Sequence, residues 1–258
     1  MREFKFFSSF HLGDQIFLLW FLNTAAKRFP YSHFLLWVPE QYFEEVRRLA
    51  RPSGNLSVVT GPRGDHNFDG WMGTDGYYFN HRGDGSKFLE FVIGFHAYIA
   101  KKHGIEPWPT TEKIEMLLPW DCMDPEHPLK DQSFDVLVVN SQPLSGECHG
   151  FDQGTLDRIA IELSQRMRVV TTHPCGNDSI QNTIGLGLKL CHVGELASRC
   201  RFVVGVANAP FLVTFNEKSF DKVEKWYNYS IDRVNFDDDR VIWSNHINDL
   251  YNQTKTIQ

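Results

Sequence analysis

The first residues with clear chemical potential are Gly13 and Asp14, in the stretch FHLGDQIFLLW that opens a very apolar segment. An aspartate here has two interpretations. Its carboxylate caps a helix by accepting a hydrogen bond from a backbone N–H of the first turn. Alternatively it is a general base that takes a proton from a hydroxyl group. The two roles are compatible, and the sequence leaves both open.

A second set of polar residues follows three apolar runs in the second half of the chain, at 134–140, 168–172 and 201–207. Open parallel sheets bind ligands outside the carboxyl ends of their strands, so the residues after these runs are candidate ligand contacts. Hydroxyls, amides and a following helix N-terminus can together hold a phosphate. The candidates are Ser141, Gln142, Ser145, Gly146, His173, Asn208 and Ala209.

Glu195 is a further candidate, in the segment VGELASRC. Its carboxylate suits the hydroxyls of a donor ribose. Equally, it is an acid in the first turn of a short helix, where the helix dipole favours negative charge. The sequence does not separate these interpretations.

Three cysteine–histidine groupings raise the question of a metal: Cys148-His149, His173-Pro174-Cys175 and Cys191-His192. Zinc uses such ligands. Their spacing matches no structural zinc pattern, and free cysteines commonly serve as small buried hydrophobes. We therefore expect no metal site.

These residues need a scaffold, and the first half predicts one. Strands are expected at 3–9, 33–38 and 56–59, with helices at 15–29 and 39–50 between them. The helix at 15–29 is apolar on every face at its start, so we expect it to be buried on more than one side. Alternating strands and helices of this kind build a doubly wound parallel sheet.

The rhythm breaks at 61–85, a glycine- and aspartate-rich segment before an expected helix at 86–103. Long irregular loops in compact domains are commonly functional. Its aromatic side chains offer a platform for sugar stacking, and its acids offer oxygen atoms to sugar hydroxyls. Those residues are Trp71, Tyr77, Tyr78, Asp69 and Asp75. The tripeptide Arg-Gly-Asp occurs twice here, which we take as chance.

Five prolines in 104–133 mark a junction, after which strands and helices alternate again. Helices are expected at 151–165 and 193–200, and two segments of the tail, 223–231 and 241–253, read as helical. The predicted fold class is α/β, with two Rossmann-like domains facing a central cleft. The predicted domains are 1–120 and 121–258, the second carrying a C-terminal tail.

Bulk properties narrow the function. The 258 residues carry a net charge of −6, so no polycationic surface for nucleic acid is expected. The longest apolar run, Ile16 to Leu22, is too short to span a bilayer. Five dispersed cysteines indicate a reducing compartment, and the N-terminus lacks the features of a signal peptide. We expect a cytoplasmic protein, with peripheral membrane contact left open.

Two segments carry a family resemblance: HLGDQIFLLWFLNTAAKRFPYSHFLLWVPEQYFEEV and VGELASRCRFVVGVANAPF. In order and separation they resemble the ADP-heptose:lipopolysaccharide heptosyltransferases. The resemblance implies a GT-B-like glycosyltransferase with an N-terminal acceptor domain and a C-terminal nucleotide-sugar domain. It implies metal-independent, inverting transfer with Asp14 as the catalytic base. The chain departs from the family in NSQPLSGECHGF, which lacks the usual cation, and in ANAPF.

The predicted function is therefore transfer of a sugar from a nucleotide-diphosphate donor to a glycan or glycolipid acceptor, with no cofactor beyond the donor substrate. Two alternatives stay open. A catalytically silent sugar- or nucleotide-binding module of the same fold would explain the missing cation. A nucleotide-sugar epimerase would need acids and histidines converging in one cleft.

Overall fold

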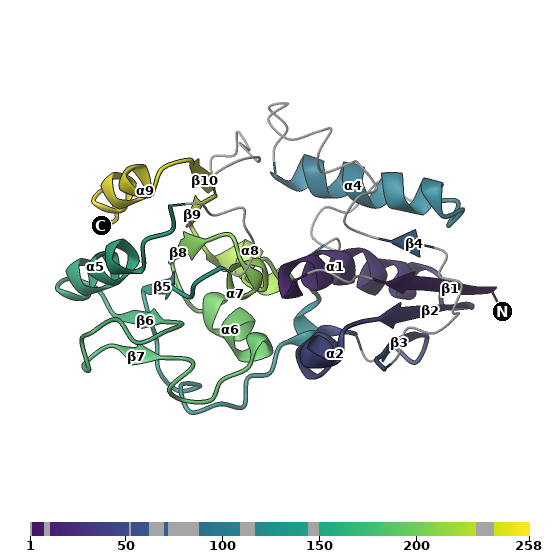
Figure 1. Ribbon diagram of the computed structural model, residues 1–258, viewed down its shortest axis with the longest axis horizontal. Helices are drawn as coiled ribbons and strands as arrows, with labels where there is room; N and C mark the ends of the chain where they lie inside the picture. Colours follow the sequence, from purple (N-terminus) through teal and green to yellow (C-terminus); the bar gives the residue numbers. More distant parts are fainter. Residues whose placement is uncertain are drawn as a thin grey trace.

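The computed structural model describes residues 2–7, 11–51, 53–61, 70–71, 88–108, 117–143, 150–230 and 240–258 (Figure 1). Ser145 and Gly146, together with Cys148 and His149, lie outside this part. Both Arg-Gly-Asp tripeptides also lie outside it. So do the side chains predicted to stack on or bind sugar, which are those of Trp71 (whose backbone alone is described), Tyr77, Tyr78, Asp69 and Asp75.

The first half contains a parallel sheet with the strand order β3-β2-β1-β4. Its strands are β1 (Arg2–Phe7), β2 (Ser32–Trp37), β3 (Leu56–Val59) and the short β4 (Gly70–Trp71). Alternate residues of β1 and β2 are buried, and Phe4 stacks on Phe34 with ring centroids 5.4 Å apart. The three strands predicted before residue 60 are confirmed.

Helix α1 (Leu12–Arg28) is buried along most of its length, as its uniformly apolar start predicts. Beside it lie the 3-10 turn η1 (Glu40–Tyr42), α2 (Phe43–Leu49) and α4 (Phe88–Lys102). The helix predicted at 39–50 is thus split, because Pro39 precedes a 3-10 turn and regular α-helix begins only at Phe43.

The second half contains a parallel sheet with the order β10-β9-β8-β5-β6-β7. This is the Rossmann order, with a topological switch point between β5 and β8. The strands are β5 (Val136–Val139), β6 (Val169–Thr171), β7 (Gln181–Asn182), β8 (Phe202–Val206), β9 (Lys225–Tyr229) and β10 (Val241–Ser244). The predicted α/β class with parallel sheets is confirmed.

Helices cover both faces of this second sheet (Figure 1). On one face α5 (Gln153–Ser164) and α9 (Ile247–Thr254) pack against the side chains of Val136 and Val138. On the other, α6 (Leu190–Ala197), α7 (Ala209–Leu212) and α8 (Glu217–Lys222) share a core with Leu137 and Val139.

The prediction for the tail is wrong in part. Residues 225–229 form strand β9 and residues 241–244 form strand β10, and only 247–254 is helical. Trp226, Tyr227 and Tyr229 are aromatic residues that favour strands, and all three are buried when β9 pairs with β8. Pairing to the sheet therefore overrides the helical reading of this segment.

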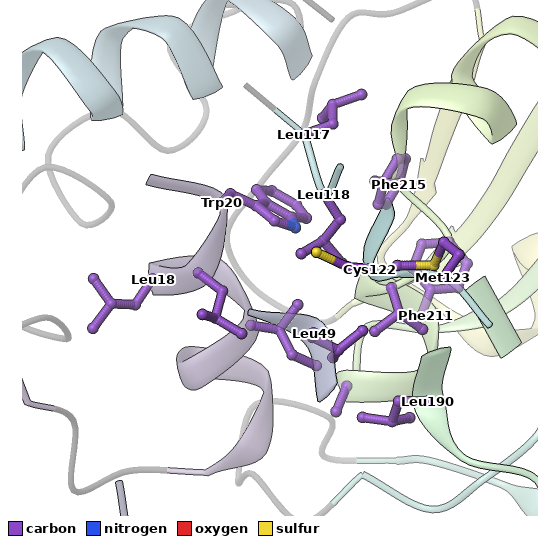
Figure 2. Packing of buried hydrophobic residues seen from close by; sticks show 14 of the residues in the cluster. Leu18, Trp20, Leu49, Leu117, Leu118, Cys122, Met123, Leu190, Phe211 and Phe215 are labelled. Atoms are coloured by element: carbon purple, nitrogen blue, oxygen red, sulfur yellow. The ribbon is translucent and has the colours of Figure 1, made fainter. Parts of the chain in front are cut away.

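One hydrophobic core runs through both halves. Trp20 of α1 lies near Phe215, with ring centroids 6.2 Å apart, and the connecting residues Leu118 and Met123 are buried in the same cluster (Figure 2). The 3-10 turn η3 (Trp120–Cys122) belongs to this connection. The domain boundary at 120/121 stays a prediction, since the core is continuous across it.

None of the helices in the described ranges combines the length and the hydropathy that crossing a bilayer requires.

Candidate functional site

The start of α1 and the start of α7 meet in the structure, although some 195 residues separate them in sequence (Figure 1). A Cβ atom built on Gly13 would lie 3.5 Å from Leu212 Cδ1 and 3.8 Å from the Ala209 backbone nitrogen. Asp14, the next residue, therefore lies at the junction between the first half and the carboxyl end of β8. The structure thus brings the start of α1, which carries the candidate base, next to the start of α7, which carries the candidate donor-site residue Ala209.

Asp14 does not cap its helix. Helix α1 begins at Leu12 with His11 as the N-cap, and the His11 carbonyl accepts hydrogen bonds from the N–H groups of Asp14 (3.1 Å) and Gln15 (3.4 Å). The capping prediction is wrong because His11, in extended conformation, starts the helix three residues earlier than expected. Asp14 sits half-buried in the first turn, where the helix dipole favours a carboxylate. Its catalytic role stays a prediction.

The carboxyl ends of β5, β6 and β8 form a single polar cluster. Asn208 Nδ2 donates to the Ser141 carbonyl at 2.8 Å and lies 3.2 Å from Ser141 Oγ. Thr172 Oγ1 lies 3.3 Å from the same hydroxyl. We name this cluster the β5/β8 edge: Asn140, Ser141, Thr172, His173 and Asn208. Three predicted residues, Ser141, His173 and Asn208, are thus brought together, while Gln142 beside them is exposed.

Asn140 belongs to the β5/β8 edge and was missed by the sequence analysis. Its side chain is fully buried and bonds to three partners on two other elements, Asp157, Thr172 and His173. The signal in the sequence is a polar residue directly after the buried run VLVV, since a buried amide at a strand end needs partners.

A carboxylate of the chain itself, that of Asp152, occupies the N-terminus of α5. Asp152 is its N-cap: one carboxylate oxygen accepts from Gly154 N–H at 3.1 Å and the other from the Thr155 hydroxyl at 2.5 Å. The Thr155 hydrogen bond, together with those of the backbone, lowers the pKa of Asp152 below its usual range. A phosphate at this helix end would meet a carboxylate, which opposes the help predicted from the helix dipole.

Glu195 is buried among its own partners. Its carboxylate lies 2.8 Å from His127 Nε2 and 2.6 Å from Arg199 Nη2. Arg199 in turn donates to the backbone carbonyls of Leu129 and Gln132, each at 3.1 Å. These contacts tie the connecting segment to α6. The ribose-binding role of Glu195 stays a prediction, and the contacts that the structure shows are structural.

Within the described residues, one trio of metal-type ligands comes together: Asp124, Cys191 and His192, with ligand atoms within 4.8 Å of one another. His192 Nδ1 accepts from Lys189 N–H at 2.9 Å, which assigns the ring proton to Nε2, 3.2 Å from Asp124 Oδ2. Burial raises the pKa of the Cys191 thiol to about 11. The trio thus fits a helix cap better than a metal site, and within the described residues it does not include His173 or Cys175.

The fold defines the class of protein: the chain is an α/β protein with two parallel sheets. The start of α1 from the first half contacts α7, which follows the switch-point strand β8 of the second sheet. No protein-family profile and no curated protein matches the sequence.

Solved structures do match. E. coli heptosyltransferase WaaC with ADP is 13% identical, with a TM-score of 0.59, over 99% of this chain and 96% of that chain. E. coli ADP-heptose lps heptosyltransferase II is 11% identical, with a TM-score of 0.55, over 99% and 100%. A glycosyl transferase family 9 protein from Veillonella parvula is 14% identical, with a TM-score of 0.51, over 99% and 90%. The chain has the fold of the heptosyltransferases, which confirms the predicted resemblance at the level of fold.

Proposed function

We propose that this protein is a glycosyltransferase that moves a sugar from a nucleotide-diphosphate donor to a hydroxyl of a glycan or glycolipid acceptor. The observation that carries the proposal is the contact between Gly13 of α1 and Ala209 of α7. This contact supports the proposal because Asp14 follows Gly13 in the chain and Ala209 follows the carboxyl end of β8. That the similar structures are glycosyltransferases, one of them holding ADP, supports the same conclusion.

In this proposal the two sheets form two domains with the acceptor on the first and the donor on the second. Asp14 takes the proton of the acceptor hydroxyl, and the oxygen attacks the anomeric carbon from the face opposite the leaving group. The new C–O bond forms as the bond to the diphosphate breaks, and the electron pair leaves with the nucleoside diphosphate. The anomeric configuration inverts, and no metal takes part in the step.

A silent binding module is the second candidate, and one observation favours it. The β5/β8 edge contains no lysine or arginine among its described residues, and Asp152 already occupies the neighbouring helix end. Such an edge binds a diphosphate without a full positive charge, so affinity falls and leaving-group stabilisation is weak.

Binding is tested first, by thermal shift of the purified chain with ADP, other nucleoside diphosphates and their sugars. A ligand that binds only the native state raises the melting temperature. Transfer is then tested with Asp14→Asn and with Asp249→Asn, an exposed aspartate in the first turn of α9, as matched control. We expect Asp14→Asn to bind donor normally and to lose about 10²–10⁴ in turnover. Parental turnover in Asp14→Asn would refute the base; ligand binding without any turnover by the parent would support the silent module.

A further inference from the structure

Asn140 extends the pairing of β5 and β6 beyond the ends of both strands. Its Oδ1 accepts the His173 N–H at 2.8 Å, and its Nδ2 donates to the His173 carbonyl at 3.1 Å. One side-chain amide thus satisfies both backbone groups of His173, as a neighbouring strand would. The Thr171 hydroxyl adds a second bond to the His173 carbonyl, at 2.7 Å.

The amide is itself held from three sides. Asn140 Nδ2 also donates to Asp157 Oδ1 of α5 at 2.8 Å, and Asp157 accepts a further hydrogen bond from Gln153 at 2.8 Å. Thr172 Oγ1 donates to Asn140 Oδ1 at 3.2 Å and accepts from the Asn140 N–H at 3.0 Å. A fully buried and fully bonded amide has one orientation, so it fixes the backbone that it contacts.

This backbone presents the His173 ring at the β5/β8 edge. The residue is half-exposed, and its ring makes no hydrogen bond or ion pair with any residue that the structure describes. Among the side chains of this edge, imidazole is the one that can carry positive charge. On the packed helix α5, Asp157 accepts a hydrogen bond from Asn140 and Asp152 is the N-cap, and both are acids.

We propose that Asn140 is the positioning residue that holds His173 where its ring meets a phosphate of the nucleotide donor. The inference rests on the proposed function, and it gives the edge a substitute for the lysine or arginine that it lacks. Asn140 itself does not contact the ligand, because its side-chain amide already makes hydrogen bonds with Asp157, Thr172 and His173. In this proposal the effect of Asn140 on ADP binding passes through His173.

The first measurement needs no ligand. Asn140→Ala removes the bonds to both backbone groups of His173, and Asn140→Ser is the milder variant for use if Asn140→Ala does not fold. Asn55→Ala is the matched control, because Asn55 is a buried asparagine whose Nδ2 donates to three backbone carbonyls in the first half. By hydrogen exchange we expect faster exchange of the peptide covering 171–176 in the Asn140 variants and unchanged exchange there in Asn55→Ala. Unchanged exchange in the Asn140 variants overturns the inference.

The second measurement is a double-mutant cycle on ADP affinity with Asn140→Ala, His173→Ala and the double variant. A hydrogen bond to a charged group is strong enough that losing it costs about tenfold or more in affinity. We expect each single variant to bind ADP about tenfold more weakly, and the double variant to bind like His173→Ala alone.

The outcomes separate the inference from the proposed function. If Asn140→Ala leaves ADP affinity unchanged, or if the two losses add, the inference fails while the proposed function stands. If the parent chain binds neither ADP nor another nucleoside diphosphate, the proposed function fails and the inference fails with it. Asn55→Ala with parental ADP affinity shows that loss of a buried amide is not in itself the cause.

Discussion

His96 is a fully buried histidine in α4, and it makes the stability of the protein depend on pH. Its ring lies among aromatic rings, with centroids 5.6 Å from Phe21, 5.9 Å from Phe95 and 6.1 Å from Trp108. Neither ring nitrogen has a hydrogen-bond partner in the part of the chain that the structure describes. Burial, and then the positive charge of Arg28, lowers the pKa of His96 to about 3. The native state therefore holds this ring neutral.

The size of the effect follows from linkage. The folded pKa of about 3 lies below the unfolded value of 6.5, so the unfolded state binds the proton first. The neutral ring's contribution is complete above pH 6.5 and is lost as the pH falls toward 3. At 1.36 kcal/mol per pH unit the full loss is about 5 kcal/mol, of which about 2 kcal/mol falls between pH 7.5 and pH 5.

We expect His96→Phe, an apolar ring of similar shape, to remove this part of the acid sensitivity. The assay is urea unfolding at pH 7.5 and pH 5, with His246→Phe as control, because His246 is exposed. The free energy of unfolding of His96→Phe should fall by about 2 kcal/mol less than that of the parent between the two pH values. His246→Phe should follow the parent. An equal fall in His96→Phe and the parent would refute the reasoning.

Two further substitutions test packing around the site. Glu195→Gln removes the negative charge from the buried contact with Arg199, and we expect a loss of about 3 kcal/mol in the urea-derived free energy of unfolding; a loss below 1 kcal/mol would contradict it. Gly205→Ala places a Cβ 2.6 Å from Val139 Cβ and 2.7 Å from its carbonyl oxygen, so we expect about 1–3 kcal/mol of destabilisation. Gly154→Ala, whose Cβ would meet nothing nearer than 3.4 Å, is its control, and equal Tm values for the two would count against the close approach of β5 and β8.

The central strands could be predicted because a strand that is buried on both faces is apolar at every position, and such a run is visible in the sequence. The runs VLVV and FVVGV are buried at every position, and both form central strands, β5 and β8. Once these strands are placed, the switch-point rule selects the residues that follow them, and it therefore predicts Ser141 and Asn208 as ligand contacts.

Hydrogen bonds between side chains that lie far apart in the sequence could not be predicted. Glu195 and His127 are 68 residues apart, and Asn140 and His173 are 33 apart. Nothing in the local sequence indicates that these side chains meet, so neither the contact between Glu195 and His127 nor the hydrogen bonds of Asn140 could be predicted. The start of α1 failed for a different reason: a helix can begin without a side-chain cap, as it does at His11.

Packing of α1 against the second half contributes to the position of the helix that carries Asp14. Buried residues of helix α1, Trp20 among them, share a core with Phe211 of α7 and with Phe215, which follows α7 (Figure 2). At the far side of that contact, Glu45 of α2 accepts the Leu190 N–H at 3.0 Å, which ties the first half to the start of α6. Because close-packed interiors transmit displacement, this shared core helps to set how the start of α1 lies relative to the β5/β8 edge. The described residues of the β5/β8 edge include no lysine or arginine, yet the core that the two halves share still holds the start of α1 next to the start of α7.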